Sequence, residues 1–441
     1  MACCNNQKNH QNKQREKLLE HTKKRMGSVF TSNQILGRIH TIGCVAVEIT
    51  QKCNLDCTLC YLSEHSQSVK DIPIEEVYRR LERVVFHYGE GTHVQITGGD
   101  PTLRKHTELV EIVRYARQIG LYPALFTNGI AATRPLLEKL SEAGLADIAF
   151  HVDTTQRRKE GETESELNDI RLEYMKRTEG LGLQVMFNTT IHRENFEQLP
   201  ELIEFFKKHA GFVNLVSFQL QAETGRGEWG SRDVIINQET VRNQIESGAG
   251  CALPWDAIQV GHTDCHSYLP TLVSNNKVFP LVPSKEFFSD FVKDFSDVQW
   301  DRVEQSKTVV LGFLKTLLRR PKWWFKGFSY LIWQLKNMFM SLVKSKAKVN
   351  RLTFFVQNFM DANHLDQERV GACSFMVMTA NGPVSMCEHN AYRDDYILQP
   401  LEFKKMDGTV DTYQPLKNQE KIRNSTLKNT PENTNIEEEI C

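Results

Sequence analysis

Three cysteines lie close together in the segment CNLDCTLC, which covers residues 53–60 and follows an apolar run at residues 45–50. Thiolates at such short spacing are typical ligands of zinc and of iron–sulfur clusters. A cluster of four irons normally takes four cysteines, so three would leave one iron open to another ligand. An open coordination position is also what distinguishes a catalytic metal site from a structural one. We therefore predict a catalytic cluster on Cys53, Cys57 and Cys60.

A structural zinc site is the alternative for these three thiols. Zinc would normally require a second pair of cysteines at C-x2-C spacing nearby. The next cysteine in the chain is Cys251. The cysteine spacing therefore favours the iron–sulfur interpretation over zinc.

The C-x3-C-x2-C spacing of Cys53, Cys57 and Cys60, placed after a first predicted strand, resembles the signature of the radical S-adenosylmethionine (SAM) superfamily. The resemblance implies a 4Fe–4S cluster whose unique iron binds the amino and carboxylate groups of SAM. It also implies an electron donor such as flavodoxin or ferredoxin. Reductive cleavage of SAM would then give methionine and a 5′-deoxyadenosyl radical, which abstracts hydrogen from an unactivated carbon. A cofactor carries such chemistry because no side chain can.

Around the cysteines, apolar and β-rich runs alternate with amphipathic segments. Strands are predicted at 44–50, 93–97, 121–127, 147–153, 183–190 and 214–220, and helices at 74–85, 105–119 and 132–143. Asp71 and Pro73 are expected to begin the first helix, and Gly120 and Gly144 to end the other two. This alternation predicts right-handed βαβ units and a parallel sheet. We predict an α/β fold, a partial (β/α)6 barrel of the TIM type, which the resemblance also implies.

Polar or glycine-rich residues follow each predicted strand, at the end of a parallel barrel where chemistry takes place. The stretch Gly98-Gly99-Asp100 is similar to the G-G-E motif of the superfamily, which meets the SAM amino group. A plain helix-entry turn is the alternative for this stretch. The other predicted SAM-binding residues are Asn128, Asp153, Asn188 and Arg226, although inward polar side chains are often satisfied within the protein.

Four further cysteines lie between residues 246 and 400, namely Cys251, Cys265, Cys373 and Cys387, and Cys441 lies in the polar tail. Cys373 and Cys387 enclose a C-x8-G-x4-C pattern that resembles the start of SPASM and twitch extensions, which hold auxiliary 4Fe–4S clusters. Our hypothesis is that all four thiols form one auxiliary site for a 4Fe–4S cluster or mononuclear iron. Ordinary buried cysteines are the alternative. His262 and His266 lie beside Cys265 and could ligate, relay a proton or line the substrate cavity.

Residues 305–360 hold eleven Lys or Arg and no Asp or Glu, together with many aromatic and aliphatic side chains. Lys336 interrupts the longest apolar stretch, so a membrane-spanning helix is not expected. Basic and aromatic residues at helical spacing are typical of a helix lying on an anionic membrane. A basic helix packed on the protein is one alternative, and a nucleic-acid surface is a weaker one.

Composition limits the partners and the compartment. The formal net charge is −1, so no overall field favours nucleic acid, and none is predicted as a partner. The eleven cysteines form an odd number, and residues 1–8 contain no apolar signal core. A reducing cytoplasm is therefore predicted, with thiols used for metal. Peripheral attachment to the inner face of the cell membrane is a further expectation, whereas lipidation of Cys3 or Cys4 is a less favoured idea.

The predicted organisation has six parts. They are a polar, basic and flexible leader (1–40), the radical SAM core (41–245), an extension carrying Cys251 and Cys265 (246–304), basic aromatic membrane-surface helices (305–350), an auxiliary metal-site segment (351–400) and a polar tail (401–441). The length of 441 residues accommodates one large and one smaller domain.

The C-terminal half also bears a more specific resemblance. Residues 359–373, with the loop at residues 261–266, look like the corresponding region of archaeal tetraether lipid synthase and its bacterial relatives. That family carries more N-terminal metal-binding cysteines than Cys3 and Cys4 offer. The resemblance implies C–C bond formation or alkylation on a membrane lipid chain. A peptide-modifying radical SAM maturase and a non-enzymatic iron–sulfur protein are the alternatives.

Overall fold

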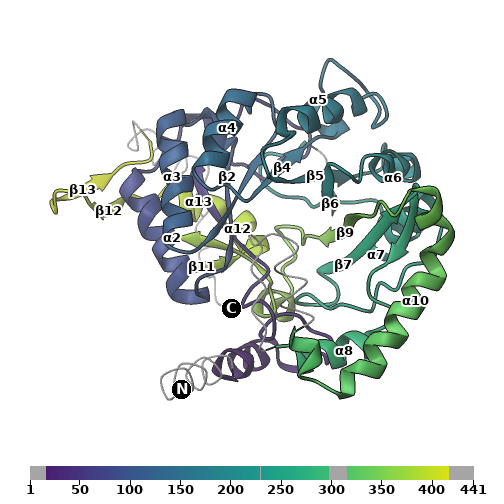
Figure 1. Cartoon of the computed structure of the whole chain (residues 1–441). Helices are drawn as coiled ribbons and strands as arrows, with labels where there is room; N and C mark the ends of the chain where they lie inside the picture. The colour runs from purple at the N-terminus through teal and green to yellow at the C-terminus, as the bar shows by residue number, and fades with distance from the viewer. Residues whose placement is uncertain (1–15, 229, 297–314, 417–441) are drawn as a thin grey trace, which may run out of the picture.

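One large twisted sheet organises the chain (Figure 1). The computed structural model describes residues 16–228, 230–296 and 315–416. Within these ranges the sheet has eleven strands in the order β11-β10-β1-β2-β3-β4-β5-β6-β9-β7-β8, and a separate hairpin pairs β12 with β13.

The first six strands form the predicted core. They are β1 (Cys44–Thr50), β2 (His93–Gly98), β3 (Tyr122–Thr127), β4 (Asp147–His151), β5 (Gln184–Ile191) and β6 (Val213–Leu220). Each pairs in parallel with the next. The intervening helices are α2 (Ile74–Tyr88), α3 (His106–Gln118), α4 (Arg134–Glu142), α5 (Asn168–Thr178) and α6 (Leu199–Lys208). The prediction of a partial barrel of six βα units is therefore confirmed.

The second half of the chain extends this sheet at both edges. Strand β9 (Asn350–Asn358) pairs in parallel with β6, and β10 (Phe375–Thr379) pairs in parallel with β1. Strands β7 (His266–Ser274), β8 (Lys277–Pro280) and β11 (Gly382–Ser385) are added in antiparallel orientation. These strands were not predicted. Within the described residues β8 and β11 are the two outer edges and do not pair, so the barrel stays open.

The remaining helices belong to the second half. They are α7 (Gln238–Ala249), α8 (Lys285–Asp294), α10 (Lys322–Lys344), α11 (Gln367–Gly371), α12 (Met386–Ala391) and α13 (Arg393–Ile397). In Figure 1, α10 runs along the outer edge of the molecule beside α8. None of the helices within the described ranges is both long and apolar enough to cross a membrane.

Strand alternation decides which side chains meet the core. In β1, Val45, Val47 and Ile49 are fully buried in the main hydrophobic cluster, which lies between the sheet and its covering helices. Helix α2 contributes Val77, Leu81 and Val84 to the same cluster, at the spacing of one helical face. The opposite face of the strands, including Glu48 of β1, points into the barrel. Polar residues on this inner face are therefore available for a ligand.

One local prediction was wrong, and two segments of the chain contain more regular structure than the sequence indicated. Asp71 does not cap α2, because its carboxylate instead accepts a hydrogen bond from the Thr50 hydroxyl at 2.7 Å. The described part of the leader is ordered, with a helix at residues 16–26 and with Met26 and Leu36 buried. The polar tail begins with the hairpin of β12 (Leu401–Lys404) and β13 (Val410–Tyr413). Residues 1–15, 305–314 and 417–441 of the predicted segments lie outside the described residues.

Candidate functional site

A cavity of about 1330 Å³ opens at the carboxyl ends of the parallel strands, where the sequence placed the site. Its lining includes Cys53, Cys57 and Cys60 from the loop after β1, and Gly98, Gly99 and Asp100 from the loop after β2. It also includes Asn128 after β3 and Asn188 on β5. The structure therefore brings eight of the predicted site residues to one cavity.

The three thiols fit a metal cluster. Burial raises the pKa of Cys53 and of Cys57 above the ordinary thiol value, so neither thiolate is stable there without a bound cation. The Asn128 amide nitrogen lies 3.8 Å from the Cys53 sulfur and 2.6 Å from the Asn54 side-chain oxygen. The loop after β3 thus holds the cysteine loop from the opposite side of the cavity. A cluster ligand set of Cys53, Cys57 and Cys60 is consistent with this donor chemistry.

Gly98 and Gly99 allow the loops after β1 and β2 to approach each other. A Cβ atom at Gly98 would lie 1.9 Å from the Thr50 carbonyl oxygen, and one at Gly99 would lie 2.0 Å from the Lys52 carbonyl oxygen. Gly98 also has φ +128°, which side chains rarely adopt. The glycines were predicted to let a ligand approach the backbone. Their contacts within the protein are with the cysteine loop, which they position.

Asp100 is buried and is engaged on both carboxylate oxygens. It accepts hydrogen bonds from the Thr102 backbone at 3.0 Å, from the Thr127 hydroxyl at 2.8 and 3.0 Å, and from the Asn128 backbone at 2.8 Å. This carboxylate therefore joins the loops after β2 and β3. Its contact with the SAM amino group remains a prediction. Such a contact would add to the hydrogen bonds that both carboxylate oxygens already accept.

Asp153 lies behind the cavity wall. Its carboxylate pairs with His151 Nε2 at 2.6 Å and accepts a bond from the Thr190 backbone at 2.7 Å. Burial opposes ionisation, yet the His151 ring and these hydrogen bonds hold the pKa of Asp153 well below its usual range. The cavity is lined by His151 and Thr155 instead. Asp153 itself is fully buried and does not line the cavity, and its predicted contact with SAM stays a prediction.

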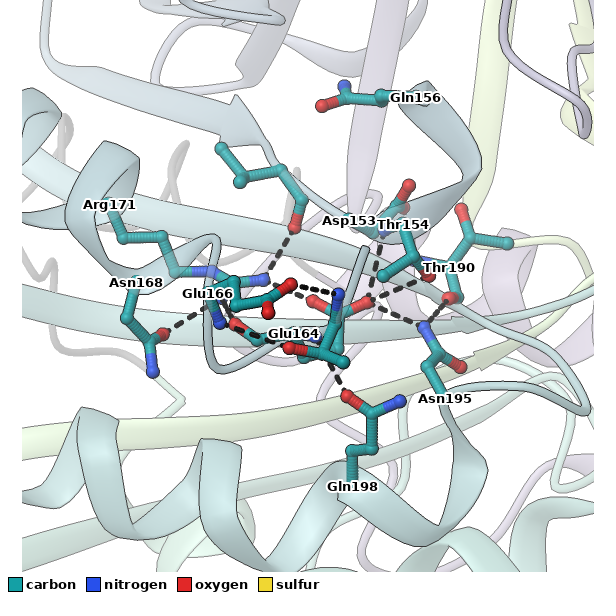
Figure 2. Close-up of polar contacts among 12 residues, drawn as sticks. Asp153, Thr154, Gln156, Glu164, Glu166, Asn168, Arg171, Thr190, Asn195 and Gln198 are labelled. Atoms are coloured by element: carbon teal, nitrogen blue, oxygen red, sulfur yellow. Dashed lines mark hydrogen bonds and ion pairs between the residues drawn. The ribbon is translucent and has the colours of Figure 1, made fainter. Parts of the chain in front are cut away.

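A second buried ion pair fixes this strand end (Figure 2). Arg171 of α5 pairs with Glu164 and donates a 2.9 Å hydrogen bond to the Val152 carbonyl oxygen. Glu164 also accepts from the Asn195 amide at 2.7 Å and from the Thr154 backbone at 3.2 Å. Because Arg171 and Glu164 are almost completely buried, the network holds residues 152–154 rigidly at the edge of the cavity.

Arg226 contacts the cysteine loop and does not line the cavity. Its guanidinium lies 3.3 Å from the Asp56 carboxylate and donates to the Leu55 carbonyl oxygen at 3.1 Å. We had predicted a direct SAM contact. The structure places Arg226 on the outer side of the cysteine loop, where it fixes the loop between Cys53 and Cys60.

One ion pair at the cavity was missed by sequence reasoning. Glu48 of β1 accepts two hydrogen bonds from Arg393 of α13, at 2.8 and 2.9 Å. Burial alone would raise the pKa of Glu48, but Arg393 outweighs it and lowers that pKa to about 2. Arg393 also lies 4.7 Å from the Tyr61 ring centroid, next to the cysteine loop. The only sequence signal was an acidic residue on the inner face of β1, and its partner is 345 positions away.

Cys265, Cys373 and Cys387 come together at a second location. Burial, followed by the charge of neighbouring thiols, raises the pKa of Cys373 to about 11 and of Cys387 to about 12. Each of these two interacts electrostatically with Cys265, whose sulfur accepts a 3.3 Å hydrogen bond from Arg369. We call these three residues the second thiol set.

Cys251 does not join the second thiol set. Its sulfur donates to the Val278 carbonyl oxygen at 3.6 Å, and its electrostatic neighbours are Glu246 and Lys207. It packs against the main hydrophobic cluster near the end of α7. The hypothesis of a four-cysteine auxiliary site was wrong in this respect, because the turn after α7 takes Cys251 into a different part of the core.

The described residues contain no group of three His, Cys, Asp or Glu side chains placed to hold a single metal ion. The mononuclear-iron alternative therefore has no preformed site among them. A cluster of four irons is larger than one ion, so its ligands stand further apart.

His262 and His266 occupy different surroundings beside Cys265. His262 is buried, and its ring lies 3.7 Å from the Glu368 carboxylate. Burial, reinforced by Arg369 and His262, lowers the pKa of His266 to about 3, so this ring is neutral. His266 lines a second cavity inside the barrel. Of the roles left open by the sequence, lining a cavity is the one that this position fits.

Comparison with known proteins defines the core. Residues 47–206 match the family model of the radical SAM superfamily. The chain carries a radical SAM domain. Radical SAM domains are enzyme domains that use a 4Fe–4S cluster and SAM, so the predictions of an enzyme and of these two cofactors are confirmed.

The curated relatives match only part of this chain. PqqA peptide cyclase of Bradyrhizobium diazoefficiens is 32% identical over 163 residues, covering 36% of this chain and 42% of that protein. A 7,8-dihydro-6-hydroxymethylpterin dimethyltransferase of Methanocaldococcus jannaschii is 27% identical over 187 residues, covering 41% of this chain and 36% of that protein. The chain thus spans about two fifths of the length of the curated relatives it matches.

Solved structures of radical SAM proteins are similar at lower identity. Streptococcus suis SuiB bound to the precursor peptide SuiA has 16% identity and a TM-score of 0.38, with 46% of this chain and 45% of SuiB covered. The protein anSMEcpe with bound AdoMet has 16% identity and a TM-score of 0.37, with 47% of this chain and 59% of that protein covered.

We expect the purified, reconstituted protein to contain about eight irons per chain, because each thiol set would hold one cluster of four. Replacing a member of the second thiol set by Cys387→Ala should lower the iron content to about four, since a cluster cannot form on two thiols. Iron and sulfide assays together with Mössbauer spectroscopy measure this change.

Cys251→Ala is the matched control, because that thiol lies apart from both sets. Its iron content should equal that of the wild-type protein. A wild-type content of about four irons would rule out the second cluster.

Proposed function

We propose that this protein is a radical SAM enzyme that modifies a peptide, using a cluster on Cys53, Cys57 and Cys60. The PqqA peptide cyclases and SuiB, which are among its relatives and structural neighbours, act on or bind peptides by name. The observation that carries the proposal comes from this chain itself. It is a set of buried polar atoms without a hydrogen-bond partner among the described residues, in the otherwise mainly apolar barrel interior beside the cysteine cavity.

This second cavity measures about 1230 Å³ and shares five lining residues with the cysteine cavity. The shared residues are Gln95, Phe126, Asn188, Gln219 and Phe375. A substrate in the second cavity would therefore lie next to SAM in the first. We call the second cavity the barrel chamber.

The polar groups of the barrel chamber match amide chemistry better than hydrocarbon. Ser217 Oγ, Gln357 Oε1 and His266 Nδ1 are buried and have no hydrogen-bond partner among the described residues. Each such group costs about 1–3 kcal/mol if it stays unpaired. Peptide N–H and C=O groups satisfy donors and acceptors of this kind, whereas an acyl chain satisfies none.

Each part of the site has a role in the proposed reaction. Cys53, Cys57 and Cys60 would hold the cluster, which when bound would supply the electron for reductive cleavage of SAM and so for radical chemistry at a substrate carbon. Asn128 holds the cysteine loop, and Gly98 and Gly99 keep the loop after β2 against it. The buried walls exclude water from the reacting carbon. We propose flavodoxin or ferredoxin as the class of electron donor.

A membrane lipid chain is the second candidate substrate. It is favoured by the basic, apolar surface of α10 and by the resemblance to the tetraether lipid synthase group. C–C bond formation or alkylation of the lipid chain would be the reaction. In either case we propose a cytoplasmic enzyme attached to the inner face of the cell membrane.

Deuterium transfer distinguishes the two substrates. The reduced holoenzyme is incubated with SAM and either a deuterated peptide pool or vesicles of deuterated lipid, both from cells grown in heavy water. Abstraction of deuterium labels the 5′-deoxyadenosine product, which mass spectrometry detects. We expect label from the peptide pool and none from the lipid.

The other outcomes are equally decisive. Label from lipid alone would replace the peptide proposal by the lipid candidate. If an intact, reduced cluster forms no 5′-deoxyadenosine at all, the assignment of radical SAM chemistry to this chain is wrong.

A further inference from the structure

We propose that helix α10 is an in-plane membrane anchor, whose outward apolar face docks the protein on an anionic lipid surface. The proposal explains how the enzyme would attach to the membrane, and it rests on the proposed function only for the location at the inner face of the cell membrane. SAM cleavage does not depend on it. The two faces of α10 and its lysines are the features on which the anchor depends.

The inward face of α10 is firmly packed on α8 and β8. Trp323 Nε1 donates to the Asp294 carboxylate at 2.8 Å, and the Trp323 ring packs edge-on against Phe295 at 5.0 Å. About two turns further on, the Tyr330 ring stacks on Phe287 at 5.2 Å. Gln334 donates to the Pro280 carbonyl oxygen at 3.1 Å. These contacts fix which side of the helix points away from the protein.

The outward face is apolar. Its exposed large side chains are Trp324, Phe325, Phe328, Leu331, Ile332, Leu335, Phe339, Met340 and Val343. Phe325 is 79% exposed and Phe328 63%. They recur at spacings of three and four residues, so they form one continuous stripe along the helix. We call this stripe the α10 apolar face.

Folding alone does not account for the α10 apolar face. A helix packed on a protein normally turns its apolar stripe inward and its polar residues outward. Here the inward face buries the polar Gln334 and Ser341 beside Trp323 and Met338, while most of the large apolar side chains of the helix face out. Soluble surfaces rarely keep a contiguous apolar stripe of this size without a partner.

The charges of α10 identify the partner as an anionic surface. The helix contains four lysines and no acidic residue. Lys322 and Lys326 pair with Asp294 and Asp290 of α8. Lys336 and Lys344 are exposed and make no ion pair within the described residues, and each lies four residues after an exposed apolar side chain. Lysines bordering an apolar stripe are typical of helices that lie on anionic lipid.

The geometry indicates that the helix lies in the plane of the membrane and does not cross it. α10 has 23 residues, but none of the described helices is apolar enough to span a bilayer. Its inward face is also held against α8 through Trp323 and Tyr330 and against β8 through Gln334. Only the outward side is free to enter the interface between headgroups and acyl chains.

Vesicle flotation tests the anchor with the reconstituted, full-length holoenzyme. The vesicles contain phosphatidylglycerol and phosphatidylcholine in equal parts. We expect the wild-type protein to float with these vesicles. The variant Phe328→Ser/Leu331→Ser/Leu335→Ser should partition at least about tenfold less, because it removes three apolar side chains that the wild-type protein would bury in the lipid. Vesicles of phosphatidylcholine alone should bind the wild-type protein more weakly.

The matched control carries three serine substitutions at exposed apolar residues on other surfaces, Phe86→Ser/Val234→Ser/Met406→Ser. It should float like the wild-type protein. If the serine variant of α10 does not fold, as judged by circular dichroism, Lys336→Glu/Lys344→Glu takes its place and should lose binding to anionic vesicles only.

Three results would overturn the proposal. They are failure of the wild-type protein to float, equal flotation of the α10 variant, and a wild-type dimer in gel filtration that the α10 variant abolishes, since the last would make a second copy the occupant of this face. SAM cleavage in solution is measured in parallel. A protein that cleaves SAM and does not float refutes the anchor and leaves the proposed chemistry intact.

Discussion

Cys57→Ala abolishes the formation of 5′-deoxyadenosine and lowers the iron content by about four atoms per chain, because the first cluster needs all three thiols of its loop. Replacement of a residue in the outer shell of a metal site already costs about 10–100-fold in activity or affinity, so loss of a direct ligand should exceed this. Chromatography of the product and an iron assay on the reconstituted protein measure both effects.

The second thiol set provides the comparison for this variant. Cys57→Ala should keep the iron bound near Cys265, Cys373 and Cys387, because these thiols lie just before β7, just before β10 and in α12, away from the cysteine loop. Cys251→Ala should retain both SAM cleavage and the full iron content. Unchanged SAM cleavage by Cys57→Ala would show that the cysteine loop does not bind the catalytic cluster.

Arg171→Met destabilises the protein by about 3–5 kcal/mol, because it leaves the buried Glu164 carboxylate without its partner. The guanidinium also supports the Val152 carbonyl oxygen beside the cavity, so SAM binding should weaken with stability. Urea unfolding monitored by circular dichroism measures the loss of stability. A separate titration of the folded protein with SAM measures the loss of binding.

Lys405→Met is the control for this substitution. It removes an ion pair with Asp411 on the protein surface, and exposed pairs of this kind contribute little to stability because solvent screens them. The double variant Arg171→Met/Glu164→Gln should recover part of the lost stability, since it removes the uncompensated charge. Equal stability of Arg171→Met and Lys405→Met would contradict the role given to the buried pair.

Local patterns in the sequence predicted the first half of the fold well. The run at residues 44–50 is strand β1 as predicted, and the strands at 147–153 and 183–190 shift by at most two residues. Gly120 and Gly144 follow the ends of α3 and α4 with φ +85° and +98°. These features depend on neighbours along the chain, so alternation and turn residues suffice to predict them.

The second half was less predictable because its strands join the sheet out of sequence order. β9 pairs with β6 across a connection of more than a hundred residues, and β10 pairs with β1 from the far end of the chain. Short strands of this kind have no local signal for their partners. For this reason no strand was predicted after residue 220.

The site shows the same division between local and distant information. Spacing predicted the cysteine loop, since its thiols are neighbours in sequence. The sequence could not show whether Asp153 and Arg226 face the cavity, because their side chains pair with His151 and Asp56 inside the protein. The Glu48–Arg393 pair joins the first strand to one of the last helices, and only the tertiary structure brings them together.

The second thiol set has a mechanical consequence for the open barrel. Cys265 immediately precedes β7 near one edge of the sheet, whereas Cys373 and Cys387 flank β10 and β11 at the other edge. A cluster bound by all three would cross-link the two free edges and shorten the loop that the unfolded chain must close. Iron loading would then act as a clasp on the barrel, and loss of the cluster to oxidation would loosen the walls of the chamber in which the substrate reacts.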